Sequence, residues 1–272
     1  MRAIVVVLLL LCSGPVAPLV AQTQPAPSSG SGHLFVPSDL WFAGGFVAGT
    51  IAMFPADRYF HDQLQDSTRQ ANQFFQNTAI AVRTVARPGA FIIGGVLYAA
   101  GRLSHDRNMA ELGLYGSEAL LVTEVTTRAV KGVAGRARPY VTGGDRPGTF
   151  QLFRGIGDND YQSFPSGHSA TAFAAAAVLT AEARDWWPHA HYYVGTVVYG
   201  GATLVALSRM YNNKHWASDV VAGAAIGTFA GWKVVRWNHS NPDNRVDRWL
   251  LGVHMTPGEG LKSAVVWIAP TM

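Results

Sequence analysis

The sequence predicts an all-α fold, a bundle of about six main helices with a short β-hairpin at the C-terminus. From Trp41 onward, apolar segments of helical length alternate with short polar joints. Charged residues make up only 14% of the chain, well below the roughly 25% of an ordinary soluble domain. The 29 glycines favour closely packed helices, or helices that contact lipid. With 272 residues, the chain can bury one complete core.

The N-terminus has the order of a secretory signal peptide, which we assign to residues 1–21. Arg2 precedes an apolar run from Ala3 to Leu11, glycine and proline breakers follow, and Leu-Val-Ala closes the segment. An uncleaved anchor helix is the alternative, although the breakers argue against a clean span. Cys12 is the only cysteine and would be lost with this segment, so no disulfide is expected. The protein is therefore expected to be exported.

Residues 22–38 are rich in proline, serine and glycine and are expected to form a flexible linker. A helical domain follows over residues 39–240, and Pro88 should kink or split its second helix. The predicted helices cover residues 39–57, 76–101, 109–137, 167–184, 190–211 and 216–238, with an amphipathic stretch at 59–75.

Residues 241–272 form a tail of different character. The segments from Trp249 to Met255 and from Ala264 to Ile268 flank the turn-rich sequence Thr-Pro-Gly-Glu-Gly. Two apolar segments around such a turn are typical of a β-hairpin. We expect the hairpin to cover one end of the helical core.

Membrane crossing stays open at this point. The stretch from Tyr192 to Ser208 comes closest to the roughly 18 uncharged residues of a span. Aromatic residues gather at segment ends, as at Trp186 and Trp187, which is typical of membrane interfaces but also of packing at helix corners. The net charge of +4 fits an anionic membrane surface or a phosphate-bearing substrate. No run of lysine or arginine indicates nucleic acid.

Two cations close the segment 109–137. Lys131 and Arg138 are seven residues apart, so both side chains can leave the same helical face. Pro139 disfavours helix at Arg138 and leaves its guanidinium at a turn. Such a pair can hold a phosphate, although cations at a helix C-terminus more often simply oppose the helix dipole.

The motif Pro165-Ser166-Gly167-His168 opens the helix 167–184. Proline suits a first helical turn, glycine lets the backbone approach a ligand, and free N–H groups at a helix start favour anions. Ordinary capping would also explain the first three residues. His168 projects from the same turn and adds a group that can donate a proton.

A third motif joins Arg209, His215 and Asp219, the last two spaced i, i+4 on one helical face. The carboxylate can accept the imidazole N–H, which leaves the other ring nitrogen free as a nucleophile. Arg209 lies upstream across a short polar turn and can fold back as a third phosphate donor. A lone His/Asp pair is more often structural, but three such motifs in this order are poorly explained by chance.

Together the motifs resemble the signature of the type 2 phosphatidic acid phosphatase and vanadium haloperoxidase superfamily, without substitution at its defining residues. The similarity covers roughly residues 85–235. It implies a helical bundle whose active site lies at the ends of the core helices. The resemblance also implies the following roles: phosphate binding for Lys131, Arg138 and Arg209, further hydrogen bonds from Ser166 and Gly167, general acid for His168, nucleophile for His215, and orientation of that nucleophile for Asp219.

The residues and the resemblance together predict a metal-independent phosphatase. His215 attacks phosphorus while His168 protonates the leaving alkoxide, and water then hydrolyses the phosphohistidine. Three fixed cations take the role that magnesium has in many phosphoryl-transfer enzymes. No metal or other cofactor is therefore expected, although vanadate fits the same pocket, and we interpret His189 and His191 as an incidental pair.

The expected substrate is a phosphate monoester or diphosphate of a lipid, such as phosphatidate, a polyprenyl diphosphate or phosphorylated lipid A. The membrane is the expected partner, with the active site facing the periplasm or exterior. Three alternatives remain at this point: a soluble, broad-specificity acid phosphatase acting on small phosphomonoesters, a vanadium-dependent haloperoxidase, and a non-catalytic membrane protein that binds phosphorylated lipid.

Overall fold

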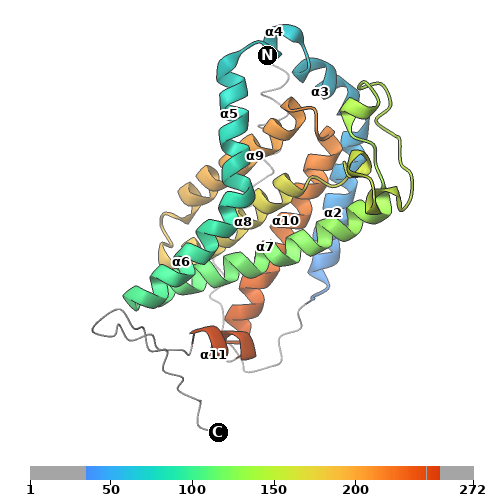
Figure 1. Ribbon diagram of the computed structural model, residues 1–272. Coiled ribbons are helices and arrows are strands. Elements are labelled where there is room, and N and C mark those ends of the chain that lie inside the picture. The colour runs from blue at the N-terminus through green and yellow to red at the C-terminus, as the bar shows by residue number, and fades with distance from the viewer. Residues whose placement is uncertain (1–34, 243, 252–272) are drawn as a thin grey trace. The chain divides into compact units, whose positions relative to one another are not determined.

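The computed structural model describes residues 35–242 and 244–251 (Figure 1). The predicted signal peptide at 1–21 and the linker up to residue 34 lie outside them. Within the described ranges, helices predominate and no strand occurs, so the all-α prediction is confirmed. The helices are α2 (Ser38–Met53), α3 (Asp57–Leu64), α4 (Ser67–Gln70), α5 (Gln73–Thr84), α6 (Ala90–Ser104), α7 (Arg107–Ala134), α8 (Gly167–Trp186), α9 (His191–Tyr211), α10 (Ala217–Ser240) and α11 (Arg245–Leu251).

The long second helix of the prediction is divided into α5 and α6. Arg87 has φ −155° and ψ 118°, outside the helical region, and Pro88 follows it. A residue before proline is pushed towards extended backbone, and proline itself cannot donate a helical hydrogen bond. The break expected at Pro88 is confirmed. It also turns the Arg87 side chain away from the regular helical register.

The α7 helix ends three residues earlier than predicted. Gly135 adopts φ +55°, the left-handed conformation that commonly terminates a helix. A Cβ at this position would lie 1.7 Å from the Gln151 carbonyl oxygen, so only glycine fits. Arg138 consequently lies beyond the helix, in extended backbone with φ −72° and ψ 154°. The prediction that Lys131 and Arg138 share a helical face was wrong in this detail, because the chain turns between them.

The α8 and α10 helices pack backbone to backbone. Gly223, Gly227 and Gly231 recur every fourth residue along α10, and all three lie against the main chain or small side chains of α8. A Cβ on Gly223 would lie 2.3 Å from the Ser166 carbonyl oxygen. Small residues at this spacing let two helices approach closely. The contact fixes the first turn of α8 relative to the first turn of α10.

Many large apolar side chains point outward, while small residues fill much of the interior between α8 and α10. Alanine and glycine account for most of the buried residues of α8 and α10. Large side chains on other helices are exposed, among them Ile92 (61%), Val125 (68%) and Val197 (73%). Extensive exposed apolar surface marks a membrane or protein contact. Small residues between helices are also typical of bundles in lipid.

Two segments are long and apolar enough to cross a membrane, by length and composition. They are Ser38–Leu64 and Gln73–Ser104, of which 6% and 12% of the most apolar window is buried. The stretch from Tyr192 to Ser208, which came closest in the sequence, does not meet these criteria among the described residues. The two apolar segments indicate association with a membrane.

The predicted C-terminal hairpin is not supported. Residues 249–251, the start of its first strand, belong to α11, and residues 252–272 lie outside the described ranges. Asn244 caps the helix, since its side chain accepts a hydrogen bond from the Asp247 N–H at 2.9 Å. At the other end, Tyr98 donates to the Leu250 carbonyl oxygen at 2.7 Å. The cap signal was overlooked because three apolar residues suggested a strand.

Candidate active site

The three motifs lie at the ends of four core helices. Lys131 is in the last turn of α7 and Arg209 in the last turn of α9. His168 is in the first turn of α8, and Asp219 is in the first turn of α10. Successive antiparallel helices bring these ends together. Besides burial, the charges of Lys131 and Arg209 both help to lower the pKa values of His168 and His215, as expected for side chains that share one site.

His215 is buried and held by a backbone carbonyl. Its Nδ1 lies 2.7 Å from the Ser163 carbonyl oxygen and 3.7 Å from Asp219 Oδ2. A carbonyl oxygen only accepts hydrogen bonds, so Nδ1 carries the proton and Nε2 keeps its lone pair. The i, i+4 spacing predicted that Asp219 accepts this proton directly. The structure assigns the direct contact to Ser163 and places the Asp219 carboxylate just beyond it.

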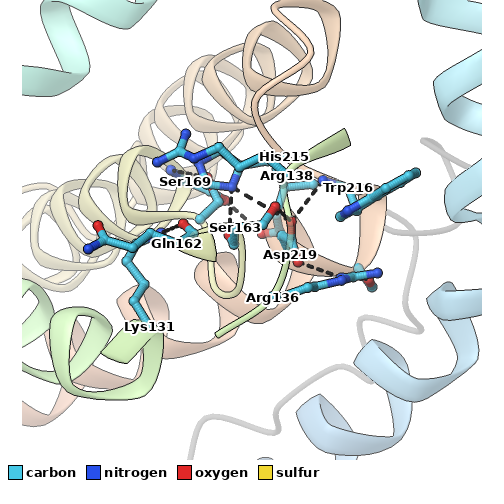
Figure 2. A network of polar contacts seen from close by, with 12 residues as sticks. Lys131, Arg136, Arg138, Gln162, Ser163, Ser169, His215, Trp216 and Asp219 are labelled. Atoms are coloured by element: carbon cyan, nitrogen blue, oxygen red, sulfur yellow. Dashed lines mark hydrogen bonds and ion pairs between the residues drawn. The ribbon is translucent and has the colours of Figure 1, made fainter. Parts of the chain in front are cut away.

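Asp219 is the central acceptor of a buried hydrogen-bond network (Figure 2). Its carboxylate accepts from the Trp216 N–H at 2.8 Å, from Ser163 Oγ at 2.5 Å and from Arg136 Nη1. Burial alone would raise the pKa of Asp219, but the Arg136 charge, with the His215 ring and the Ser163 hydroxyl, holds it well below its usual range. The carboxylate therefore stays charged beside His215 and favours a positive charge on that ring.

Arg136 anchors this network and was missed by the sequence analysis. Its side chain is fully buried, and Nη2 lies 2.6 Å from Asp57 Oδ2. Asp57 in turn accepts from the Ser218 N–H and hydroxyl, each at 2.7 Å. One guanidinium thus links the start of α3 to the start of α10. Its Nε and Nη2 also donate to the Pro147 carbonyl oxygen, at 2.9 and 2.6 Å, and its Nη1 donates to Ser218 Oγ at 2.7 Å.

The three cations of the motifs differ in their own hydrogen bonds. Lys131 Nζ donates to the Gln162 carbonyl oxygen at 2.6 Å, and Arg138 Nε donates to the Asn159 carbonyl oxygen at 2.8 Å. Arg209 is buried, and its Nε and Nη1 have no hydrogen-bond partner among the described residues. Buried donors of this kind are costly to leave unpaired. Arg209 is therefore prepared to donate to an anion.

Burial and the crowding of positive charge lower the affinity of Lys131 and Arg209 for protons. Burial, followed by the Arg138 charge, lowers the pKa of Lys131 to about 7. The same two causes lower the pKa of Arg209 to about 10. Like charges held close together in a buried site favour whatever brings negative charge between them. A phosphate group would relieve this repulsion.

His168 shares the same positive environment. Burial, and then the charges of Arg209 and Arg87, lower the pKa of His168 to about 3. The free site therefore holds the imidazole neutral at pH 7. An anion bound between Lys131, Arg138 and Arg209 would offset their positive charge and raise the pKa of His168. Binding of the anion would therefore favour protonation of His168.

Ser166 and Gly167 mainly position the motif. The Ser166 N–H donates to the Asp219 carbonyl oxygen at 2.9 Å, and its hydroxyl accepts from the Ser169 N–H at 3.4 Å as the cap of α8. A Cβ on Gly167 would lie 3.0 Å from Arg87 Nη1 and 3.8 Å from Lys131 Cε. Its absence makes room for these two cations beside the turn.

Within the described ranges, no group of three or more His, Cys, Asp or Glu side chains is placed to hold a metal ion. His191 instead lies at the start of α9, where its Nδ1 is 2.7 Å from the Pro188 carbonyl oxygen.

Residues 113–243 match the model of the PAP2 superfamily. The chain is 37% identical over 115 residues to the lipid A 1-phosphatase of Porphyromonas gingivalis, which covers 41% of this chain and 22% of that protein. It is 30% identical over 91 residues to the undecaprenyl-diphosphatase of Sulfolobus acidocaldarius, covering 34% and 40% of the two chains. The chain thus spans less than half the length of these two curated relatives.

The fold is also similar to a solved structure, that of a transmembrane PAP2-type phosphatidylglycerolphosphate phosphatase from Bacillus subtilis. The TM-score is 0.52 at 18% sequence identity, and the match covers 76% of this chain and 97% of that one. Most of the matched family region is the four-helix core from α7 to α10, which carries the three motifs. The resemblance predicted from the three motifs is therefore confirmed for the region that carries them, because residues 113–243 match the PAP2 superfamily.

Proposed function

We propose that the protein is a metal-independent, membrane-associated phosphatase that hydrolyses a phosphate monoester or diphosphate of a lipid through a phosphohistidine at His215. The observation that carries this proposal is the pairing of two features in one buried site. Arg209 presents two donor nitrogens that have no partner in the described part of the chain, and the Nδ1 contact of His215 leaves its Nε2 unprotonated. A phosphate between them would satisfy the donors and meet the nucleophile.

In the first chemical step, His215 Nε2 attacks phosphorus and the bond to the leaving alkoxide oxygen breaks. Lys131, Arg138 and Arg209 stabilise the equatorial oxygens, while His168, charged once the phosphate is bound, protonates the leaving oxygen. Asp219 stabilises the positive ring of His215 across 3.7 Å. Water then attacks the phosphohistidine with His168 as the base, which releases inorganic phosphate and restores both histidines.

Three features support a lipid as the leaving alcohol. Two apolar segments have the length of a membrane span. Large apolar side chains face outward around a core of small residues. The names of the relatives refer to lipid A and undecaprenyl diphosphate as substrates of those proteins. In this proposal, the 39–240 domain is preceded by a signal peptide at 1–21 and a linker at 22–38, and the site faces the periplasm or exterior.

The test measures phosphate release by the full chain in detergent micelles from phosphatidate, farnesyl diphosphate and a soluble phosphomonoester, with EDTA in excess. Wild-type protein is expected to act on a lipid phosphate, and His215→Asn is expected to lose at least about 10³-fold in kcat. His191→Asn is the matched control, because His191 lies at the start of α9, where its ring contacts the Pro188 carbonyl oxygen and the neighbouring Tyr192 rather than any motif residue in the described part of the chain. Rapid quenching should trap an acid-labile phosphohistidine in wild-type protein and in His191→Asn, but not in His215→Asn.

Each rival gives a different result in the same experiment. Full activity of His215→Asn would refute the nucleophile, and loss in EDTA that zinc or magnesium restores would refute the metal-independent mechanism. Preference for the soluble ester would favour a soluble acid phosphatase. Lipid binding without phosphate release would favour a non-catalytic protein, and peroxide-dependent halide oxidation after vanadate loading would favour a haloperoxidase.

A further inference from the structure

Arg87 lies against the active-site turn although it belongs to none of the three motifs. The break between α5 and α6 takes its backbone out of helical geometry. Its Nη1 is 3.0 Å from the position that a Cβ on Gly167 would occupy, and Lys131 Cε is 3.8 Å from that same point. The two cations therefore lie side by side along the turn that carries His168.

A carboxylate fixes the orientation of Arg87 without using all of its donors. Arg87 Nη2 donates to Glu124 Oε1 at 2.5 Å, with 27% of the arginine side chain and 14% of the glutamate side chain exposed. The same oxygen also accepts from Arg128 Nε. The single negative charge of Glu124 thus pairs with two arginines, so the three side chains together carry a net positive charge. The Nη1 edge of Arg87 is directed towards the turn of α8.

Two more cations, Arg83 and Lys214, act electrostatically on or with the cations of the site. Arg83 is exposed one helical turn before Arg87, and its charge contributes to the lowered pKa of both His168 and Arg209. Lys214 Nζ lies 4.3 Å from the centre of the Tyr140 ring, and the charges of Arg138, Arg209 and Arg83 help burial to lower the pKa of Lys214. The positive region therefore extends beyond the three motif cations.

A single phosphate does not account for this surplus of charge. The cradle of Lys131, Arg138 and Arg209 already supplies three cations to one phosphoryl group. Arg87 adds a fork-shaped donor held in place by Glu124, and arginine forks match the geometry of phosphate oxygens. Arg87 and Lys131 lie next to the same point beside Gly167. A second phosphate bonded directly to one held by Lys131 would therefore reach Arg87.

We propose that Arg87, oriented by Glu124 and assisted by Arg83, forms a second anion subsite that binds the inner phosphate of a diphosphate ester. The inference rests on the proposed phosphatase activity and narrows its substrate class. His215 forms a bond to the outer phosphorus, and the bond from that phosphorus to the bridging oxygen breaks. The leaving group is a phosphate monoester, and Arg87 stabilises the charge that develops on it. Water then releases the outer phosphate as inorganic phosphate.

The test compares farnesyl diphosphate with farnesyl monophosphate, which differ only in the inner phosphate. In Arg87→Gln, kcat/KM for the diphosphate is expected to fall about 10- to 100-fold more than for the monophosphate, the range for a lost charge-assisted hydrogen bond. Arg128→Gln is the matched control, because it loses the other partner of Glu124 on a side chain that is 74% exposed. Arg87→Lys, which keeps the charge without the fork, is expected to give an intermediate ratio.

If Arg87→Gln leaves the ratio of kcat/KM for the diphosphate to that for the monophosphate unchanged, the subsite is refuted while the phosphatase proposal stays intact. If the wild-type protein releases phosphate from neither substrate, the proposed activity fails. The subsite is then tested separately, by measuring the binding of inorganic pyrophosphate and of phosphate with titration calorimetry. Tighter binding of pyrophosphate that Arg87→Gln abolishes would support the subsite. Equal binding of the two anions by the wild-type protein would refute it.

Discussion

Replacing Arg136 with methionine removes the guanidinium that joins Asp57 to Asp219 while keeping an apolar side chain of similar length. Both carboxylates are fully buried, so the change leaves two unpaired charges inside the protein. Removing one partner of a buried ion pair costs about 3–5 kcal/mol. Because two carboxylates lose their counter-charge, we expect about 5 kcal/mol, a large share of the roughly 5–15 kcal/mol that stabilises a typical fold. For a chain of this size, the melting temperature should fall by about 10–20 °C.

The assay is thermal unfolding of purified variants in detergent, followed by circular dichroism. Arg128→Met is the control, because the Arg128 side chain is 74% exposed and its ion pair with Glu124 should be worth less than about 1 kcal/mol. Adding Asp57→Asn to Arg136→Met removes one of the two buried charges that have lost their partner. The double variant should therefore recover part of the lost melting temperature. A melting temperature within about 3 °C of wild type for Arg136→Met would refute the reasoning. A double variant no more stable than the single one would do so as well.

The same variant should change the pH dependence of activity. In the wild-type protein the lowered pKa of Asp219 keeps its carboxylate charged, so its contribution is present at neutral pH and is lost only as pH falls through that lowered pKa. Without Arg136, burial is less opposed and the pKa of Asp219 rises. The acid limb of the kcat profile should therefore move to higher pH in Arg136→Met. An unchanged acid limb would show that Arg136 does not set the charge of Asp219.

Three further predictions concern the core and the site. Gly227→Ala should destabilise the protein by more than about 2 kcal/mol in thermal unfolding, because its Cβ would lie 2.0 Å from the Ala170 carbonyl oxygen. Gly200→Ala, with nothing in the described part of the chain within 4 Å, should be neutral or stabilising; equal losses would contradict the packing argument. The pKa of His168, followed by NMR, should lie well below 6.5 in the free protein and rise on adding phosphate, and a midpoint near 6.5 in both states would disprove this. Ser163→Ala should lower kcat about tenfold, measured at saturating substrate, because the carbonyl that holds His215 remains; complete loss would contradict that assignment.

The helices and their breaks were largely predictable because their signals are local. Helical periodicity, the proline at residue 88 and the serine that caps α8 each act over a few residues. The C-terminal hairpin was wrong for a related reason. Trp249, Leu250 and Leu251 are three apolar residues in a row, and so short a run cannot distinguish a strand from a buried helical turn. The decisive contact, from Tyr98 to the end of α11, spans 152 residues.

The candidate site was predictable where spacing carries the chemistry. The motif residues of α7 to α10 meet because each lies at a helix end, as the sequence order implies. Ser163 and Arg136 were missed for different reasons. Ser163 contacts His215 through its backbone carbonyl. Every residue has such a carbonyl, so the residue type gives no signal for this contact. Arg136 lies inside the first motif as a spacer, and its role depends on Asp57, which is 79 residues away in the chain.

The close packing of α8 on α10 has a consequence for how such a site can change its substrate. The distance between the turn that carries His168 and the turn that carries Asp219 is set by main-chain atoms, at Gly223 against Ser166 and Gly227 against Ala170. Main-chain contacts have no rotamers, so side-chain rearrangements elsewhere do not alter them. If the proposed function holds, mutations in α5, in the break at Arg87 or in the loop after α7 can therefore change which headgroup the site accepts. The reacting groups keep their geometry while the selectivity around them evolves.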